Sequence, residues 1–237
     1  GFGNGTFLGV PWSGGETVHA SGDGRQWTSV PSPFPDTRNI GFGNETLVAV
    51  SDTAGIATST EGRTWTIRQP SSTLSLNSVT FGDDIFVGAG MDYGFSPPLP
   101  AVMRSSDGTN WVRQTIEGKH SLVDVAYGNG TFVAVGGSYN YSRSQTKAIY
   151  SSKDGAAWTQ RLEDPSGPLN SLVWGNGKFV AVGNAGYILS SADGISWEPM
   201  RLPTTDDRVS VAHGNGTFVA VGGPRTGANY LRSAVIF

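Results

Sequence analysis

One sequence pattern recurs along the whole chain and restricts its fold more than any other feature. Its six copies are GFGNGTFLGV (1–10), GFGNETLVAV (41–50), FGDDIFVGAG (81–90), YGNGTFVAVG (127–136), WGNGKFVAVG (174–183) and HGNGTFVAVG (213–222). The glycine before each Asn or Asp stands at positions 3, 43, 82, 128, 175 and 214, which gives spacings of 40, 39, 46, 47 and 39 residues. Such a period indicates that one supersecondary unit is repeated.

Each repeat divides into four segments with the pattern of β-strands. The first, such as VDVAY, alternates between apolar and polar residues, as a half-buried strand does. An Asn-Gly pair follows, typical of a type I′ hairpin turn, and leads into an almost wholly apolar second strand, TFVAVG. A third strand, such as AIYSS, and a fourth that opens on Trp complete the unit. Four antiparallel strands in about 40 to 45 residues predict a blade of a β-propeller.

A second pattern joins the third strand to the fourth in five repeats: SGDGRQW, STEGRTW, SSDGTNW, SKDGAAW and SADGISW. The Asp can accept backbone N–H bonds within its own turn, and Gly supplies a positive φ. The Trp should bury roughly 200 Å² between neighbouring strands or blades. Glu61, with its longer side chain, predicts a looser turn. We expect only a structural role for these residues: Ser21, Asp23, Trp27, Ser59, Glu61, Trp65, Ser105, Asp107, Trp111, Ser152, Asp154, Trp158, Ser191, Asp193 and Trp197.

These turns resemble the Asp-box, or BNR, repeats of sialidase-like propellers. The family pattern is Ser-x-Asp-x-Gly-x-x-Trp, whereas this chain has Ser-x-Asp-Gly-x-x-Trp, which is one residue shorter. The resemblance covers nearly the whole chain and implies a propeller fold. It does not select a function, because such boxes occur in sialidases, xyloglucan-cleaving glycosidases, sorting receptors, photosystem assembly factors and secreted bacterial proteins.

The number of repeats predicts one all-β domain over 1–237, a propeller of six four-stranded antiparallel blades whose first and last blades are incomplete. The alternatives are five complete blades or a fragment of a larger ring. The predicted repeat units are approximately 1–37, 38–76, 77–121, 122–168, 169–207 and 208–237.

Composition excludes several classes of partner. The net charge is −3, without the basic stripe of a nucleic-acid-binding domain, and no apolar run approaches the roughly 20 residues that span a bilayer. Cysteine is absent, and His19, His120 and His213 are isolated in sequence. His213 takes the place of Tyr127 and Trp174 in the repeat, which favours packing. We expect no nucleic acid, no membrane insertion, no metal and no cofactor.

The loops between second and third strands are long and variable, and variable loops on a rigid scaffold commonly carry binding sites. Strand direction places the loops 11–17, 91–100, 137–147 and 224–230 on one face, opposite both kinds of short turn. We expect the loops at 91–100 and 137–147 to form a crevice. The candidate ligand-binding residues, which suit a glycan or a protein, are Trp12, Asp92, Tyr93, Phe95, Tyr139, Asn140, Tyr141, Arg143 and Tyr230. The plain alternative is that these rings only pack within their own loops.

Three functions remain open. The first is a non-catalytic binding or adhesion propeller of a secreted or cell-surface protein that binds a glycan through its loops. The second is a sialidase-like glycoside hydrolase. The resemblance implies that such an enzyme needs three arginines, a Tyr–Glu pair and an acidic Asp, and none of the twelve arginines lies in a recognisable motif. No spacing singles out a pair of carboxylates, so no catalytic residue is predicted. The third is a scaffold without a small ligand.

Overall fold

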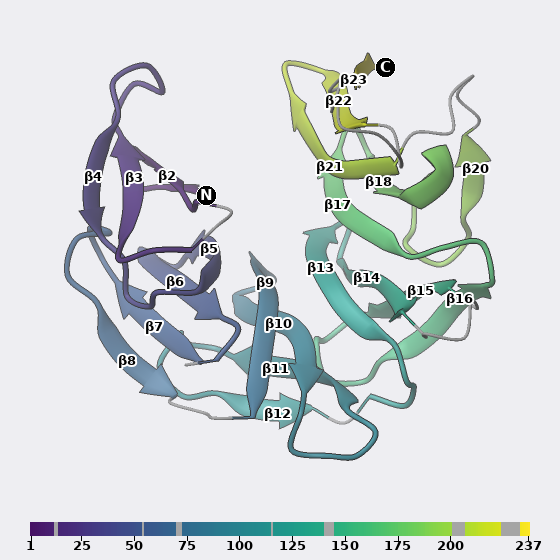
Figure 1. The fold of residues 1–237 in the computed structure, drawn as a ribbon, viewed down its shortest axis with the longest axis horizontal. Helices are drawn as coiled ribbons and strands as arrows, with labels where there is room; N and C mark the ends of the chain where they lie inside the picture. The colour runs from purple at the N-terminus through teal and green to yellow at the C-terminus, as the bar shows by residue number, and fades with distance from the viewer. Residues whose placement is uncertain are drawn as a thin grey trace. The chain divides into compact units, whose positions relative to one another are not determined.

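The computed structural model contains six antiparallel sheets that follow one another along the chain (Figure 1). The structure describes residues 1–11, 14–53, 55–69, 73–114, 116–139, 145–200, 207–223 and 233–237. The chain divides into two compact units, Gly1–Gly118 and Lys119–Phe237, and each is described by itself. We call them the N-terminal and C-terminal units, and we number the sheets as blades 1 to 6 in chain order.

The N-terminal unit holds three four-stranded sheets in which each strand pairs with the next along the chain. Blade 1 consists of β1 (Phe2–Gly3), β2 (Thr6–Gly9), β3 (Thr17–Ser21) and β4 (Thr28–Pro31). Blade 2 consists of β5 (Thr37–Gly43), β6 (Thr46–Ser51), β7 (Ile56–Ser59) and β8 (Thr66–Gln69). Blade 3 consists of β9 (Leu74–Gly82), β10 (Ile85–Asp92), β11 (Leu99–Ser105) and β12 (Val112–Gln114).

The C-terminal unit holds two four-stranded sheets and one three-stranded sheet. Blade 4 consists of β13 (Ser121–Gly128), β14 (Thr131–Tyr139), β15 (Gln145–Ser152) and β16 (Thr159–Asp164). Blade 5 consists of β17 (Leu169–Gly175), β18 (Lys178–Gly183), β19 (Ile188–Ser191) and β20 (Glu198–Met200), with a 3₁₀ turn, η1 (Asn184–Gly186), between β18 and β19. Blade 6 consists of β21 (Asp207–Gly214), β22 (Thr217–Gly223) and β23 (Ser233–Ile236).

The second strand of each complete blade after the first is almost wholly buried. All eight residues of β10 are buried, as are five of the six in β18. Their neighbours on both sides supply further aliphatic side chains, so apolar runs are buried on both faces, as the sequence predicts. The all-β fold of four-stranded antiparallel blades is confirmed, with a two-residue β1 and a three-stranded last sheet. Within the described residues, no helix is long and apolar enough to cross a membrane.

A glycine before the hairpin turn lets consecutive blades approach closely. A Cβ on Gly128 would lie 2.0 Å from the Trp174 ring, and one on Gly175 would lie 2.2 Å from the His213 ring. Gly3 and Gly43 meet the rings of Phe42 and Phe81 in the same way. In these blades, the aromatic or His residue directly before the glycine, such as Trp174 before Gly175, therefore packs on the glycine of the preceding blade. This arrangement confirms the packing role predicted for His213, whose ring also lies 4.7 Å from that of Phe218.

The Trp residues after the Ser-x-Asp-Gly turns differ in burial. Trp111 is 8% exposed and packs with Phe86 and with blade 2 residues such as Val48, while Trp65 packs on a cluster that includes Leu8. Trp27 is 47% exposed, and Trp65, Trp158 and Trp197 are only partly buried, which corrects the expectation that all five are buried. Trp65, Trp111 and Trp197 pack on clusters that include residues of the preceding blade, whereas no blade precedes Trp27 within the N-terminal unit.

The hairpin turns and the Ser-x-Asp-Gly turns lie at the same end of the blades within each unit. Asn4 Nδ2 donates to the carbonyl of Thr60 at 2.8 Å, and Asn129 Nδ2 donates to that of Ala192 at 3.2 Å. Both bonds connect a hairpin turn to the Ser-x-Asp-Gly turn of the next blade. All six hairpins have positive φ at both central residues, which confirms the predicted type I′ geometry. We call this the turn end of the blades and the opposite one the loop end.

Candidate functional site

The loop between β10 and β11 presents the candidate binding residues that the structure describes. It is fixed at its base, because the Tyr93 N–H donates to the carbonyl of Thr73 at 2.8 Å, and the Gly94 N–H donates to Asp92 Oδ1 at 2.8 Å. Asp92 is the last residue of β10 and is buried. The start of the loop is therefore continuous with a fully buried strand, which gives it a rigid support.

Arg113, on β12, ties this loop to the neighbouring outer strands of blade 3. Its guanidinium forms an ion pair with Asp92 Oδ2, and its Cζ lies 5.0 Å from the centroid of the Phe95 ring. A guanidinium over a ring face is attracted by the ring quadrupole, and its planar fork suits a carboxylate. One cation thus holds both the carboxylate at the base of the loop and the ring at its tip. Sequence reasoning did not single out Arg113, because no motif in the sequence indicates that β12 packs against this loop.

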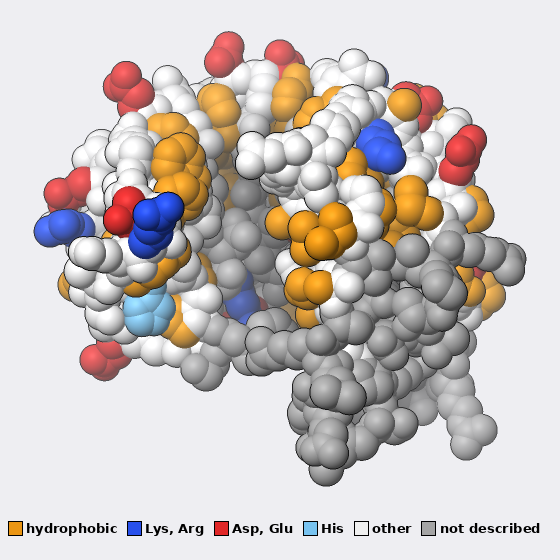
Figure 2. All heavy atoms as spheres, turned by 90° about the horizontal axis from the view of Figure 1, so that it is seen from above, with side chains coloured by type: hydrophobic (Ala, Val, Ile, Leu, Met, Phe, Trp, Pro, Cys, Tyr) orange, Lys and Arg blue, Asp and Glu red, His pale blue; other side chains and the backbone are white. Residues whose placement is uncertain are grey.

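Tyr93 and Phe95 remain accessible on this support. Tyr93 is 62% exposed and Phe95 is 47% exposed. Apolar side chains of the described residues also reach the surface in separate places elsewhere (Figure 2). What distinguishes the pair is its setting beside a buried carboxylate and a bound guanidinium. The two rings are therefore not packed away within their own loop.

The remaining candidates fall on parts of the chain that the structure does not describe. Tyr139 ends β14, but its side chain lies outside the described residues. The others, Trp12, Asn140, Tyr141, Arg143 and Tyr230, lie entirely outside them. The crevice between the loops at 91–100 and 137–147 therefore stays a prediction, and the structure brings together Asp92, Tyr93 and Phe95 only.

A buried lysine at the loop end of the C-terminal unit was missed by sequence reasoning. Lys147 Nζ lies 3.1 Å from Asp164 Oδ1, contacts the Ser166 hydroxyl and stands 3.6 Å from the centroid of the Tyr187 ring. Hydrogen bonding from Ser166 and then the ammonium of Lys147 lower the pKa of Asp164. These contacts satisfy the cation internally, so it joins two blades rather than offering a charge to a ligand.

A buried histidine in the same unit was also missed. His120 Nδ1 lies 2.8 Å from the Tyr150 hydroxyl, and its Nε2 lies 3.4 Å from Glu163 Oε1. Burial lowers the pKa of His120 and raises the pKa of Tyr150 to about 12. The isolated position of His120 in the sequence gave no signal, because its partners come from β15 and β16. Both rings are nearly fully buried, so the His120–Tyr150 pair is closed to substrate, although the Glu163 side chain is 40% exposed.

The carboxylates of the Ser-x-Asp-Gly turns bind their own backbone. Asp154 Oδ1 accepts from the N–H groups of Ala156 and Ala157, both at 2.9 Å, and from the Ser152 hydroxyl at 3.0 Å. Backbone hydrogen bonds are the largest cause that lowers the pKa of Asp154, and they act likewise on Asp23, Asp107 and Asp193. Such carboxylates stay ionised as hydrogen-bond acceptors and staple the turn.

Glu61, for which a looser turn is predicted, makes different bonds from the Asp residues of the other four turns. Its Oε1 accepts from the Thr64 hydroxyl at 2.6 Å, while the Ser59 hydroxyl accepts from the Glu61 and Gly62 N–H groups. The carboxylate thus binds a side chain where an Asp binds the backbone. Among the described residues, no group of three or more His, Cys, Asp or Glu side chains could hold a metal ion.

Comparison with known proteins shows the fold. No family model and no curated protein matches the chain. Similar solved structures include YCF48 bound to a D1 peptide, with 18% identity and a TM-score of 0.57. That match covers 93% of this chain and 65% of the YCF48 chain. A chain of a nidogen/laminin complex is 12% identical with a TM-score of 0.63, and the match covers 98% of this chain and 93% of that one. An ancestral GH74 enzyme is 16% identical with a TM-score of 0.64, and the match covers 85% of this chain and 30% of the enzyme chain. The chain thus spans just under two thirds of the YCF48 structure and under a third of the GH74 enzyme.

At these identities, the likeness carries the fold and not the activity. The neighbours are β-propellers, and they include proteins in complex with a peptide or another protein as well as an enzyme. The chain is therefore a β-propeller, and the likeness selects neither binding nor catalysis for it.

Proposed function

We propose that this chain is a non-catalytic binding propeller that recognises a glycan through the loop end of its blades. The observation that carries the proposal is the pair of exposed rings, Tyr93 and Phe95, held on blade 3 by the Asp92–Arg113 ion pair. Rings fixed in place lose little conformational freedom on binding, and the adjacent charges supply hydrogen-bonding specificity. Aromatic faces with nearby Asp and Arg suit a sugar, which has apolar ring faces and hydroxyl edges.

The carboxylates of the described residues weigh against a sialidase-like glycoside hydrolase. A hydrolase of that class holds one carboxylic acid with a raised pKa beside a second carboxylate. Where hydrogen bonding shifts a carboxyl pKa among the described residues, the shift is downward, as in Asp154, Glu163 and Asp164. The carboxylate nearest the exposed rings, Asp92, is paired with Arg113. The enzyme remains the second candidate because one structural neighbour is an ancestral GH74 enzyme.

We extend the proposal to family and location. The turns that bind their own backbone support membership of the Asp-box propellers, and we propose a secreted or cell-surface location because secreted bacterial proteins are among the proteins that carry such boxes. Detection of the native protein in culture medium or at the cell surface, against a cytoplasmic marker, tests the location. Recovery only with the cytoplasmic marker would contradict it.

A glycan array and a set of chromogenic glycosides, applied to the same protein, test the function. The proposal predicts binding to a defined set of glycans without release of chromophore. Tyr93→Ala combined with Phe95→Ala should abolish the binding, whereas Val112→Ala, at another exposed apolar residue of blade 3, should preserve it. Turnover of any glycoside that the double variant loses would favour the hydrolase. Absence of any array signal would reject glycan binding and leave a protein partner or a scaffold.

A further inference from the structure

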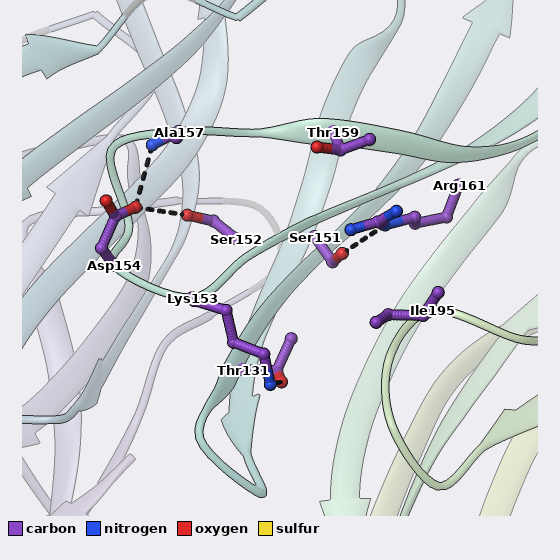
Figure 3. A pocket seen from close by; sticks show the side chains of 9 residues that line it. All are labelled: Thr131, Ser151, Ser152, Lys153, Asp154, Ala157, Thr159, Arg161 and Ile195. Carbon is purple, nitrogen blue, oxygen red and sulfur yellow. Dashed lines mark hydrogen bonds between the residues drawn. The ribbon is translucent and has the colours of Figure 1, made fainter.

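A shallow pocket of about 220 Å³ lies at the turn end of the C-terminal unit, between blades 4 and 5 (Figure 3). Its walls come from three segments. Blade 4 supplies the start of β14 and the region from the end of β15 into β16, and the β19–β20 turn of blade 5 supplies Ile195. None of these residues belongs to the loop-end site, so the inference drawn here does not rest on the proposed function.

Two cations line this pocket, and buried hydroxyls hold both. Lys153 Nζ donates to Thr131 Oγ1 at 2.6 Å, and Arg161 Nε donates to Ser151 Oγ at 2.8 Å. Thr131 and Ser151 are 1% and 2% exposed, whereas the two cationic side chains belong to exposed residues. Neither cation has an Asp or Glu oxygen within 4.0 Å among the residues that the structure describes. The buried hydroxyls of Thr131 and Ser151 thus orient the two cations without an ion pair that would neutralise their charge.

The equivalent position between blades 2 and 3 shows which part of this pocket belongs to the repeat. There, Arg68 Nε donates to Thr58 Oγ1 at 2.7 Å, as Arg161 does to Ser151. Each arginine stands at a register shift of its outer strand. However, Thr60 replaces Lys153 in the turn, and Thr109 replaces Ile195. The arginine is a repeated structural feature, and the lysine and the isoleucine are additions at this one position.

The chemistry of the lining defines the ligand. Two fixed cations suit a carboxylate or a sulfate, and charge-assisted hydrogen bonds to such groups are the stronger kind. Thr159 adds an exposed hydroxyl, and Ile195, which is 42% exposed, adds an apolar wall. Asp154 also lines the pocket, where its Oδ1 accepts from the N–H groups of its own turn, so the lining holds two cations and one anion. The volume is below the roughly 300 to 1,000 Å³ of pockets for drug-sized ligands, so one unit of a longer chain fits.

The strand beside the pocket favours a saccharide over an extended peptide. A peptide could add to β16, the outer strand of blade 4, only by continuing its hydrogen-bond ladder. The register shift at Arg161 disrupts that ladder, as bulges do where edge strands are protected from pairing. We propose that the pocket lined by Lys153, Arg161 and Ile195 binds an acidic sugar unit, with its carboxylate or sulfate between the two cations.

Binding of four probes to the full chain tests this site. The probes are a heparin-derived hexasaccharide, hexagalacturonate, neutral maltohexaose and a hexaglutamate peptide, each titrated by calorimetry at low and high salt. The proposal predicts binding of one or both acidic saccharides, weaker at high salt because screening reduces charge attraction. Maltohexaose should not bind, and hexaglutamate should bind more weakly than the acidic saccharides.

Three variants locate the site. Lys153→Thr, which introduces the residue of blade 2, and Arg161→Gln should each weaken acidic-saccharide binding about tenfold or more, as loss of a charge-assisted hydrogen bond does. Arg68→Gln is the matched control, because it removes the same arginine-to-hydroxyl bond from blade 2, and it should leave the affinity unchanged. Ile195→Glu adds an exposed negative charge at the rim and should weaken binding without unfolding. Thermal melting of each variant checks its fold.

Several results would overturn the proposal. They are absence of binding to both acidic saccharides, equal binding of maltohexaose, tighter binding of hexaglutamate, or an equal loss in Arg68→Gln and Arg161→Gln. Failure of this site is distinguishable from failure of the loop-end site, since Tyr93→Ala with Phe95→Ala changes no residue of this pocket.

Discussion

The two ends of the blades use the same kinds of residue for different purposes. At the turn end, Asp154 and its equivalents bind their own backbone, and Asn4 and Asn129 bind the next blade. At the loop end, Asp92 is held by an arginine from another strand and supports two exposed rings. Side chains that recur from blade to blade therefore stabilise the blades, whereas side chains that occur once are available for recognition.

The same distinction applies within the turn end. Arg68 and Arg161 occupy equivalent positions and make equivalent bonds, but Arg161 lines a pocket together with Lys153, where blade 2 has Thr60 in place of the lysine. Departure from the repeat, rather than location on one end, is therefore the feature that marks a candidate site.

The largest expected effect comes from breaking a contact between blades. Gly128→Ala would place a Cβ 2.0 Å from the Trp174 ring, so one blade must move. Trp111→Ala removes a buried ring and should cost about 3–5 kcal/mol of unfolding free energy. Trp27→Ala, at an exposed ring, should cost far less. Urea unfolding of all three checks the order. Equal losses for Trp27→Ala and Trp111→Ala would show that burial between blades is not what matters.

A smaller loss is expected from the ion pair at the loop end. Asp92→Asn should cost about 1–3 kcal/mol, because Arg113 loses its carboxylate while remaining partly buried. Arg38→Gln, which breaks the more exposed Arg38–Asp52 pair of blade 2, should cost less than about 1 kcal/mol. Asp92→Asn should also weaken any glycan signal, since it releases the Phe95 support. An Asp92→Asn variant with unchanged stability and unchanged binding would show that Asp92 does not support the two rings.

The buried histidine predicts a pH dependence that is specific to the C-terminal unit. Burial lowers the pKa of His120, so the unfolded chain takes up a proton first as the pH falls below about 6.5. Stability is therefore fully present above that pH and declines on acidification. Glu163, Lys119 and Tyr150 are the charged and titratable groups that face the ring. His120→Gln should flatten the pH dependence of the unfolding free energy between neutral pH and pH of about 5.5, as measured by urea unfolding at each pH.

The smallest effect concerns the Asp residues of the turns. The pKa of Asp107 is lowered, first by the N–H of Asn110, so its stabilisation is present above the unfolded value of about 3.9 and is lost below it. Asp107→Asn should reduce the acid dependence of unfolding, by less than about 1 kcal/mol because the group is exposed. An unchanged acid dependence would show that the backbone bonds contribute nothing measurable.

The repeated part of the fold could be predicted from sequence because each blade carries the local patterns that specify its own strands and turns. Asn129 and Gly130 specify a type I′ turn locally, and the positions of Gly128 and of the Trp174 ring return in every repeat, filled by a glycine and by an aromatic or His residue. The bond from Asn129 to the next blade could not be predicted, because it depends on the approach of two blades and not on one repeat.

The candidate sites were less predictable for the same reason. Tyr93 and Phe95 stood out as aromatic residues in a long loop, but Arg113 comes from a strand about 20 residues later. His120 meets Tyr150 and Glu163 only when three strands pack together. Lys153 lies within a turn that sequence reasoning treated as structural throughout. Residues that act together across strands leave no periodic signal.

Melting temperature and glycan binding, measured together on Tyr93→Ala with Phe95→Ala and on Trp111→Ala, separate the roles of unrepeated and repeated residues. The double variant should melt within about 4 °C of the native chain, as for a change of about 1 kcal/mol or less, yet lose at least about tenfold in affinity. Trp111→Ala should melt much lower but bind normally while folded. The reverse result, with binding retained by the loop variant and lost by folded Trp111→Ala, would contradict the division between repeated residues that stabilise and unrepeated residues that bind.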